Sequence, residues 1–243
     1  GGFGGKIPVY LEPVVSILSK KSGRPVKAIM ERSNVFQASG PAPGGTITVK
    51  MGTDKDANII AAETSIKLEA GGFPGAAVGA AVQCIFAPYD IPNTRIDGYD
   101  IVVNKPKSAA YRAPGSPQAA FAAETVSDEL ARIHNMDPID FRLQNASKED
   151  TRRADGVVFP KIGNVEVLEA AKASEHWKSD LGTPAKGRVR GRGVASGYWF
   201  NVGLKSAVSL TVNNDGSVAL VEGSTDIGGT RTSISMQAAE VLG

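Results

Sequence analysis

The first regular pattern along the chain is helical. Apolar residues recur at helical spacing from Leu11 to Leu18, on one side of an otherwise polar segment. Gly23 and Pro25 follow within a few residues, and both are typical of the end of a helix. The sequence therefore predicts an N-terminal helix that stops before Gly23.

Strand patterns come next. Segment 26–32 (VKAIMER) reads as a strand. Segments 46–52 and 58–70 alternate polar and apolar residues on either side of a turn-rich stretch, which predicts a β-hairpin. Segment 71–81 is too rich in glycine for us to predict a helix or a strand there, and 94–104 (TRIDGYDIVVN) is expected to be a further strand.

Helical spacing returns from Pro117. The apolar residues that share one predicted face are Phe121, Val126, Leu130 and Ile133. Asp137 followed by Pro138 is typical of the start of another helix, with Phe141 and Leu143 turned inward. We expect segment 148–164 to be irregular.

The last third of the chain predicts a helix over 164–177 and a hairpin over 206–223. Asp215 and Gly216 occupy the expected hairpin turn. Residues 224–243 read as a glycine turn that leads into a helix.

Helices and hairpins in mixed order predict an α+β fold with mixed sheets and two lobes. The best boundary candidate is the glycine- and arginine-rich segment 183–193. We therefore expect a first domain over 1–147, a connector with a helix over 148–192, and the start of a second domain over 193–243, with both domains partial.

Composition changes this picture little. The 243 residues are 42% hydrophobic, enough to bury a real core, and 27 basic against 25 acidic residues leave a net charge of +2. The densest basic run, 185–193, lies among glycines without interleaved aromatic residues, so it is typical of a solvated connector. We expect no nucleic-acid partner.

Cysteine and histidine content limits metal chemistry. A single cysteine, Cys84, excludes an internal disulfide framework and cannot supply an iron–sulfur cluster or a thiolate zinc site. Two histidines far apart in the sequence disfavour a histidine metal site. We expect no metal ligand among its side chains, so any metal must arrive on an organic carrier. No apolar run approaches the ~20 residues of a membrane span, and no signal peptide is visible. A cytoplasmic location is expected, and the missing initiator methionine suggests a piece of a longer chain.

Three glycine-rich turns stand out. The first places Phe3 within the glycines of segment 1–5, followed by Lys6. It is not a phosphate-binding P-loop, because Ile7 stands where a serine or threonine should follow the lysine. Such a turn can be purely structural, or its backbone N–H groups can form a cradle for an anion or a heteroatom.

The other two turns leave the same alternatives open. Arg112 precedes a turn with two prolines and a glycine, where a guanidinium and the amide of Gln118 could meet a phosphate or a polar ring. Gly228 and Gly229 precede a helix whose first residues carry hydroxyl groups. Those hydroxyls could cap the helix, or the turn could bind an anion at the helix N-terminus.

In this order, segments 1–6 (GGFGGK), 110–124 (AYRAPGSPQAAFAAE) and 223–233 (GSTDIGGTRTS) resemble the molybdenum-binding subunit of the xanthine dehydrogenase and aldehyde oxidase family. This family includes the carbon monoxide dehydrogenase large subunit and hydroxybenzoyl-coenzyme A reductase. Segments 86–93 and 136–146 are also similar to the family.

The resemblance implies that the three turns wrap a molybdopterin that carries molybdenum, often as its cytosine dinucleotide in bacteria. The implied cofactor-binding residues are Gly2, Phe3, Gly4, Arg112, Gly115, Gln118, Gly228 and Gly229. Gly2, Phe3 and Gly4 would line the cofactor next to the metal, and Arg112 would contact the molybdopterin. The two domains would then be parts of two molybdopterin-binding domains.

The family hydroxylates an aldehyde or a carbon beside a heteroatom, with water as the oxygen source, and its electrons leave through iron–sulfur clusters to a flavin (FAD). The implied partners are the remainder of the molybdenum subunit, iron–sulfur and flavin subunits, and a small-molecule substrate. The family's catalytic glutamate is expected beyond Gly243, so we assign that role to neither Glu124 nor Glu240. The chain alone is expected to be inactive.

Two other functions remain open: a non-catalytic binding or assembly module of the same ancestry, and an unrelated dinucleotide-binding protein. The second is disfavoured because no strand precedes the first glycine cluster.

Departures from the family pattern bear on the substrate. Purine-oxidising members carry a glutamate at the position of Ile7, and they carry an arginine at the position of Ala80 or a neighbour. This chain lacks both charged side chains, so xanthine is disfavoured as a substrate. Gly229 stands where many relatives have a glutamine, which puts one pocket contact in doubt. Ala113 and Pro114 replace the cysteine of carbon monoxide dehydrogenases. An aldehyde or an aromatic or heterocyclic compound is the expected substrate.

Overall fold

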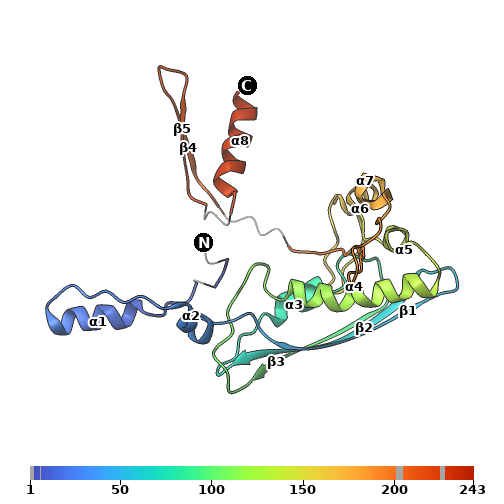
Figure 1. Ribbon diagram of the computed structural model, residues 1–243, viewed down its shortest axis with the longest axis horizontal. Helices are drawn as coiled ribbons and strands as arrows, with labels where there is room; N and C mark the ends of the chain where they lie inside the picture. Colours follow the sequence, from blue (N-terminus) through green and yellow to red (C-terminus); the bar gives the residue numbers. More distant parts are fainter. Residues whose placement is uncertain (1–2, 6, 201–204, 225–227) are drawn as a thin grey trace. The chain divides into compact units, whose positions relative to one another are not determined.

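A computed structural model describes residues 3–5, 7–200, 205–224 and 228–243 of the chain (Figure 1). Contacts between Cα atoms divide the chain into two compact units. Unit 1 comprises 1–40, 110–112 and 200–243, and unit 2 comprises 41–109 and 113–199. The polypeptide therefore passes from one unit to the other several times, and the middle glycine turn contributes residues to both.

Unit 2 is built on a three-stranded sheet. Strand β1 (Gly45–Thr53) pairs antiparallel with β2 (Ile59–Gly71), as the hairpin pattern predicted. Strand β3 (Thr94–Val102), also predicted, pairs parallel with β2. Antiparallel strands can be joined by a short turn, whereas the parallel pair needs a longer crossover. The crossover here contains helix α3 (Val78–Cys84), in the segment where glycine content prevented a prediction.

Helices α3 and α4 (Ser116–Ile133) cover one face of this sheet (Figure 1). Between them and the sheet lies the main core, in which Ile66, Leu68 and Phe141 are almost fully buried. Burial of these apolar side chains is the main force that holds the layers together.

The predicted inward face of α4 is wrong in two positions. The side chains of Phe121 and Ile133 are 79% and 70% exposed, whereas Leu130 lies in the core. The residues of α4 with the least exposure are small, notably Ala119 and Ala123. Small residues let the helix approach the sheet closely. A pattern counted on large apolar residues therefore placed Phe121 and Ile133 on the buried face incorrectly.

A buried ionic network crosses the inner side of α4. Glu124 is 5% exposed; its Oε2 accepts from Arg142 Nε at 2.8 Å and its Oε1 from the Tyr89 hydroxyl at 2.5 Å. Arg142 is fully buried and also contacts Asp128 Oδ1 at 2.8 Å. Burial, aided by the Glu124 carboxylate, raises the pKa of Tyr89 well above its ordinary value, so the phenol stays a donor.

Helices α5 (Pro138–Gln144), α6 (Asn164–Ala173) and α7 (Glu175–Lys178) enclose a smaller second core. Segment 148–163 is irregular, as expected, apart from one isolated bridge between Arg152 and Val158. The predicted helix over 164–177 is present but breaks at Ser174, whose hydroxyl caps α7 by accepting from the Trp177 amide.

The predicted start of α5 is confirmed. The Asp137 carboxylate accepts from the amides of Ile139 and Asp140, at 2.7 and 3.3 Å. Asp137→Ala should therefore lower the free energy of unfolding by about 1 kcal/mol. Asp137→Asn keeps an accepting oxygen and should stay close to the unsubstituted protein. Thermal unfolding of the full-length protein measures both, and equal losses in the two variants would contradict the capping role.

Unit 1 contains α1 (Glu12–Ser22), α2 (Arg32–Ala38), the hairpin of β4 (Val208–Val212) and β5 (Val218–Glu222), and α8 (Thr230–Leu242). Helix α1 ends before Gly23, as predicted, and Gly23 adopts the left-handed conformation. The hairpin and the last helix were also predicted. Among the described residues, no helix combines the length and the apolar character that crossing a membrane requires.

The predicted strand at 26–32 is absent. No described strand pairs with this segment, and α2 begins at Arg32 instead. The Asn34 side chain accepts from the Glu31 amide at 3.1 Å, which favours helix initiation at this point. A segment with strand-forming residues becomes a strand only when a partner strand satisfies its backbone groups.

Candidate functional site

The first glycine turn has a backbone that few residues can adopt. Phe3 and Gly4 both have positive φ, +51° and +101°. A Cβ atom on Gly4 would lie 2.9 Å from the carbonyl oxygen of Ala110, so only glycine fits here without a shift. Gly2, also predicted to bind cofactor, lies outside the described residues.

Residues 110–112 of the middle turn pack directly on the first turn. The Arg112 amide donates to the Phe3 carbonyl at 2.6 Å. The Arg112 guanidinium carbon lies 5.7 Å from the centroid of the Phe3 ring, a cation–π distance. The Tyr111 ring meets Phe3 edge to face at 6.2 Å. The structure thus brings together Phe3, Gly4 and Arg112, which the sequence placed in separate motifs.

Two consecutive residues of the middle turn have left-handed backbone. Arg112 has φ +32° and Ala113 has φ +55°. Non-glycine residues in this region cost roughly 1–3 kcal/mol each, and they persist only where surrounding contacts impose them. Such strain is concentrated at binding and active sites, so it supports a functional role for this turn.

The rest of the middle turn belongs to unit 2. Gly115 is buried and has φ +88°, and an added Cβ would lie 2.4 Å from the Ala77 carbonyl oxygen. The Gln118 amide nitrogen lies 3.4 Å from the Pro43 carbonyl, while its Oε1 is buried with no hydrogen-bond partner among the described residues. A buried acceptor in this state suits a ligand or a water that donates to it.

The third turn precedes α8. Gly228 and Gly229 have φ +100° and +96°, which explains the glycine pair. In the described part of the turn, no side chain caps α8, and the first backbone bond of the helix runs from Ser233 N to Gly229 O at 2.9 Å. The residue that precedes the helix, Gly229, has no side chain, so no side-chain cap comes from that position.

Sequence reasoning did not single out Tyr10. Its hydroxyl contacts the carbonyl oxygens of Gly5 and Ser39, at 3.2 and 2.5 Å, and so ties the end of the first turn to the end of α2. An aromatic residue soon after a glycine cluster was the available signal.

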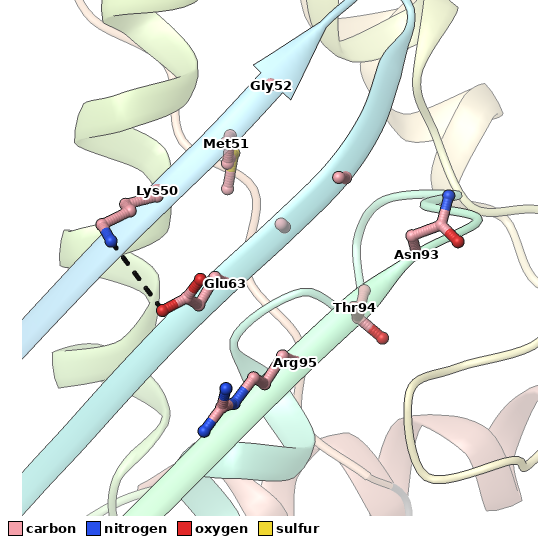
Figure 2. A pocket seen from close by; sticks show the side chains of 9 residues that line it. Lys50, Met51, Gly52, Glu63, Asn93, Thr94 and Arg95 are labelled. Atoms are coloured by element: carbon pink, nitrogen blue, oxygen red, sulfur yellow. Dashed lines mark ion pairs between the residues drawn. The ribbon is translucent and has the colours of Figure 1, made fainter.

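A separate hollow of about 470 Å³ lies beside strands β1, β2 and β3. Figure 2 shows Lys50 and Glu63 turned towards each other across two strands, at 3.9 Å, with Arg95 on the next strand. The hollow contains none of the predicted cofactor-binding residues. Its charged, exposed lining is typical of the solvated face of a sheet.

Comparisons with known proteins show the family to which the chain belongs. Residues 1–146 match a family described as the molybdopterin cofactor-binding domain. The large molybdopterin subunit of nicotinate dehydrogenase from Eubacterium barkeri is 32% identical over 71% of this chain and 41% of its own length. The molybdenum-binding subunit PaoC of aldehyde oxidoreductase from Escherichia coli (strain K12) is 31% identical over 100% of this chain and 34% of its own length.

A solved structure shows the same α+β fold. The aldehyde oxidoreductase from Desulfovibrio desulfuricans superposes with a TM-score of 0.66 at 24% identity, over 90% of this chain and 25% of that one. The chain spans about two fifths of the nicotinate dehydrogenase subunit and about a third of PaoC. The predicted resemblance is confirmed: the chain belongs to the family of molybdenum-binding subunits of xanthine dehydrogenases and aldehyde oxidoreductases, and its residues 1–146 match their molybdopterin cofactor-binding domain.

Proposed function

We propose that this chain binds molybdopterin within a molybdenum hydroxylase that oxidises an aldehyde or an aromatic or heterocyclic C–H group, with water as the oxygen donor. The observation that carries the proposal is the packing of Arg112 on the strained Phe3–Gly4 turn. When bound, the molybdenum cofactor supplies the two-electron oxidation. The chain's own residues bind and orient that cofactor.

The residues present fit such a group. The Arg112 side chain is exposed and has no ion-pair partner among the described residues, so its fork of donors is available to a phosphate or a polar ring. The Gln118 Oε1 atom is a buried acceptor that a pterin N–H group could satisfy. Backbone N–H groups around Gly228 and Gly229 would meet the pterin or its phosphate at the start of α8.

The first turn also bears on substrate choice. The Ile7 side chain is 77% exposed and apolar, at the place where purine-oxidising relatives carry a glutamate. A site built to hydrogen-bond a polar substrate strongly rejects analogues that lack the matching groups. A site with the apolar Ile7 side chain offers a purine no such hydrogen bond. We therefore favour an aldehyde or an aromatic or heterocyclic substrate over xanthine.

We further propose that the chain divides into 1–147, 148–192 and 193–243, and that the pterin is the cytosine dinucleotide form. Iron–sulfur and FAD-containing partners would accept the electrons, and the protein would be cytoplasmic.

Metal and pterin analysis of the full-length protein tests the proposal. We expect the purified protein to contain molybdenum and a molybdopterin. Arg112→Ala should lower the molybdenum content about tenfold or more, because it removes charge-assisted hydrogen bonds to the cofactor. Arg95→Ala is the matched control: it removes an exposed arginine from β3 and should leave the content unchanged.

A full-length protein that holds no molybdopterin, when produced in cells that make the cofactor, would show that the proposed function is wrong. Full cofactor content in Arg112→Ala would leave the function intact and reject only the role of Arg112.

A further inference from the structure

The segment 192–199, named here the strap, is extended and alternates between inward and outward residues. Arg192, Val194, Ser196 and Tyr198 are partly buried, and the residues between them are exposed. The Arg192 guanidinium donates to the carbonyl oxygens of Trp177 and Ser179, at 2.6 and 2.8 Å. Val194 packs against the second core. The first half of the strap is therefore bound to α7 and its surroundings.

The second half of the strap is bound to α4. The Ser196 amide donates to Glu124 Oε2 at 2.6 Å, which adds the strap to the buried ionic network. The Ser116 hydroxyl donates to the Tyr198 carbonyl oxygen, also at 2.6 Å. Ser116 is the first residue of α4 and only 7% exposed. The strap thus contacts α4 both in its middle and at its N-terminal end.

The Tyr198 side chain fixes the strap at this point. Its ring meets Phe159 edge to face at 5.7 Å, and the Arg153 guanidinium carbon lies 5.3 and 5.5 Å from the centroids of the two rings. The Tyr198 hydroxyl also hydrogen-bonds Arg153. The Tyr198 carbonyl that accepts from Ser116 is consequently held by a packed cluster of side chains rather than by a free loop.

The use of the Ser116 hydroxyl is unusual for a residue in the first turn of a helix. Serine hydroxyls there commonly bond to nearby backbone of the same turn. Here Gly115 precedes the helix, and no side chain among the described residues caps it. The Ser116 hydroxyl instead bonds to the Tyr198 carbonyl, 82 positions away in the sequence. The first turn of α4 is therefore held between Ala77 and Ala81 of the α3 region on one side and the strap on the other.

We propose that Ser116 is a positioning residue for cofactor binding. It stands between Gly115 and Gln118, two residues assigned to the molybdopterin site, and its bond to the strap holds both in the geometry that binding requires. This inference rests on the proposed function. It adds the strap, a segment outside the three glycine turns, to the parts of the chain that determine how long the cofactor stays bound.

The test uses the full-length protein loaded with cofactor. Ser116→Ala should release molybdenum about three- to tenfold faster than the unsubstituted protein, at a temperature where both remain folded. The variant loses the bond to the Tyr198 carbonyl and the contact with the Cys84 thiol. Ser116→Thr keeps the hydroxyl and should restore slow release. Ser127→Ala is the matched control, because it removes a buried serine hydroxyl of α4 whose described contacts are Ala123 O, at 3.0 Å, and the Tyr89 side chain. Neither contact lies in the strap or in the first turn of α4.

Hydrogen exchange of the cofactor-free protein provides a second measurement. The Ala119 amide donates to Gly115 O at 3.1 Å and reports on the first turn of α4. A peptide that covers this turn should exchange faster in Ser116→Ala and not in Ser127→Ala. Release as slow as in the unsubstituted protein, or equally fast release in Ser127→Ala, would overturn the inference alone. If the unsubstituted protein holds no molybdopterin, the proposed function fails first, and the inference fails with it.

Discussion

Gly115→Ala is expected to lower the free energy of unfolding by about 2–5 kcal/mol and to prevent cofactor loading. Gly115 has φ +88°, a conformation that costs a residue with a Cβ about 1–2 kcal/mol. The new Cβ would lie 2.4 Å from Ala77 O and 2.9 Å from Ala81 N. Both are backbone atoms, so relief requires a backbone shift, and overpacking of this kind costs about 1–3 kcal/mol. Thermal unfolding and molybdenum analysis of the full-length protein measure the two effects.

Gly79→Ala is the control for this substitution. Gly79 lies in α3, close to the same contact, and an added Cβ would meet no described atom within 4 Å. Alanine is a better helix former than glycine by about 0.8–1.0 kcal/mol, so this variant should be as stable as the unsubstituted protein or more so. Normal stability in Gly115→Ala would show that the turn does not pack on Ala77 as described.

Arg142→Leu is expected to cost about 3–5 kcal/mol, because it leaves the buried Glu124 carboxylate without its cation. The loss includes the bond to Glu124 at 2.8 Å, the contact with Asp128 at 2.8 Å, and the bond from Nη1 to the Pro138 carbonyl at 3.0 Å. An exposed pair gives the contrast. Arg95→Leu breaks the ion pair with Asp97, which lies in solvent, and should change stability by less than about 1 kcal/mol.

A double substitution separates charge from packing in this network. Adding Glu124→Gln to Arg142→Leu removes the uncompensated charge but keeps an oxygen that can accept from Tyr89. Part of the lost stability should return, since removing both charges costs less than removing one. Thermal unfolding of the single and double variants gives the coupling. If the double variant is as unstable as the sum of the single losses, the charges do not interact as the structure indicates.

The elements that sequence predicted correctly carry local signals. Gly23 ends α1, Asp137 caps α5, and Gly216 has the positive φ of the β4–β5 turn. Each signal depends on the backbone of a few adjacent residues. The failures depend on distant partners. Segment 26–32 reads as a strand but has no described partner strand. The inner face of α4 follows from small residues such as Ala123, which carry little weight in a hydrophobic pattern.

The candidate site also combines features that the sequence predicted with contacts that it could not predict. The order of the motifs predicted a shared site, and the structure places Phe3 and Arg112 in contact. Their strongest link is a backbone hydrogen bond, for which no side-chain pattern exists. The roles of Tyr10 and Ser116 depend on which carbonyl oxygens the fold brings to their hydroxyls. Sequence could therefore indicate the turns but not the contacts that hold them in place.

The bond between Phe3 and Arg112 sets an order for biosynthesis. Arg112, the residue that completes the first glycine turn, is synthesised only after the whole of β1, β2 and β3. Chains fold from the N-terminus as they emerge, and contacts between distant residues close late. The first glycine turn therefore stays incomplete until the central sheet has been synthesised. If this turn binds the cofactor as proposed, loading would follow the synthesis of Arg112.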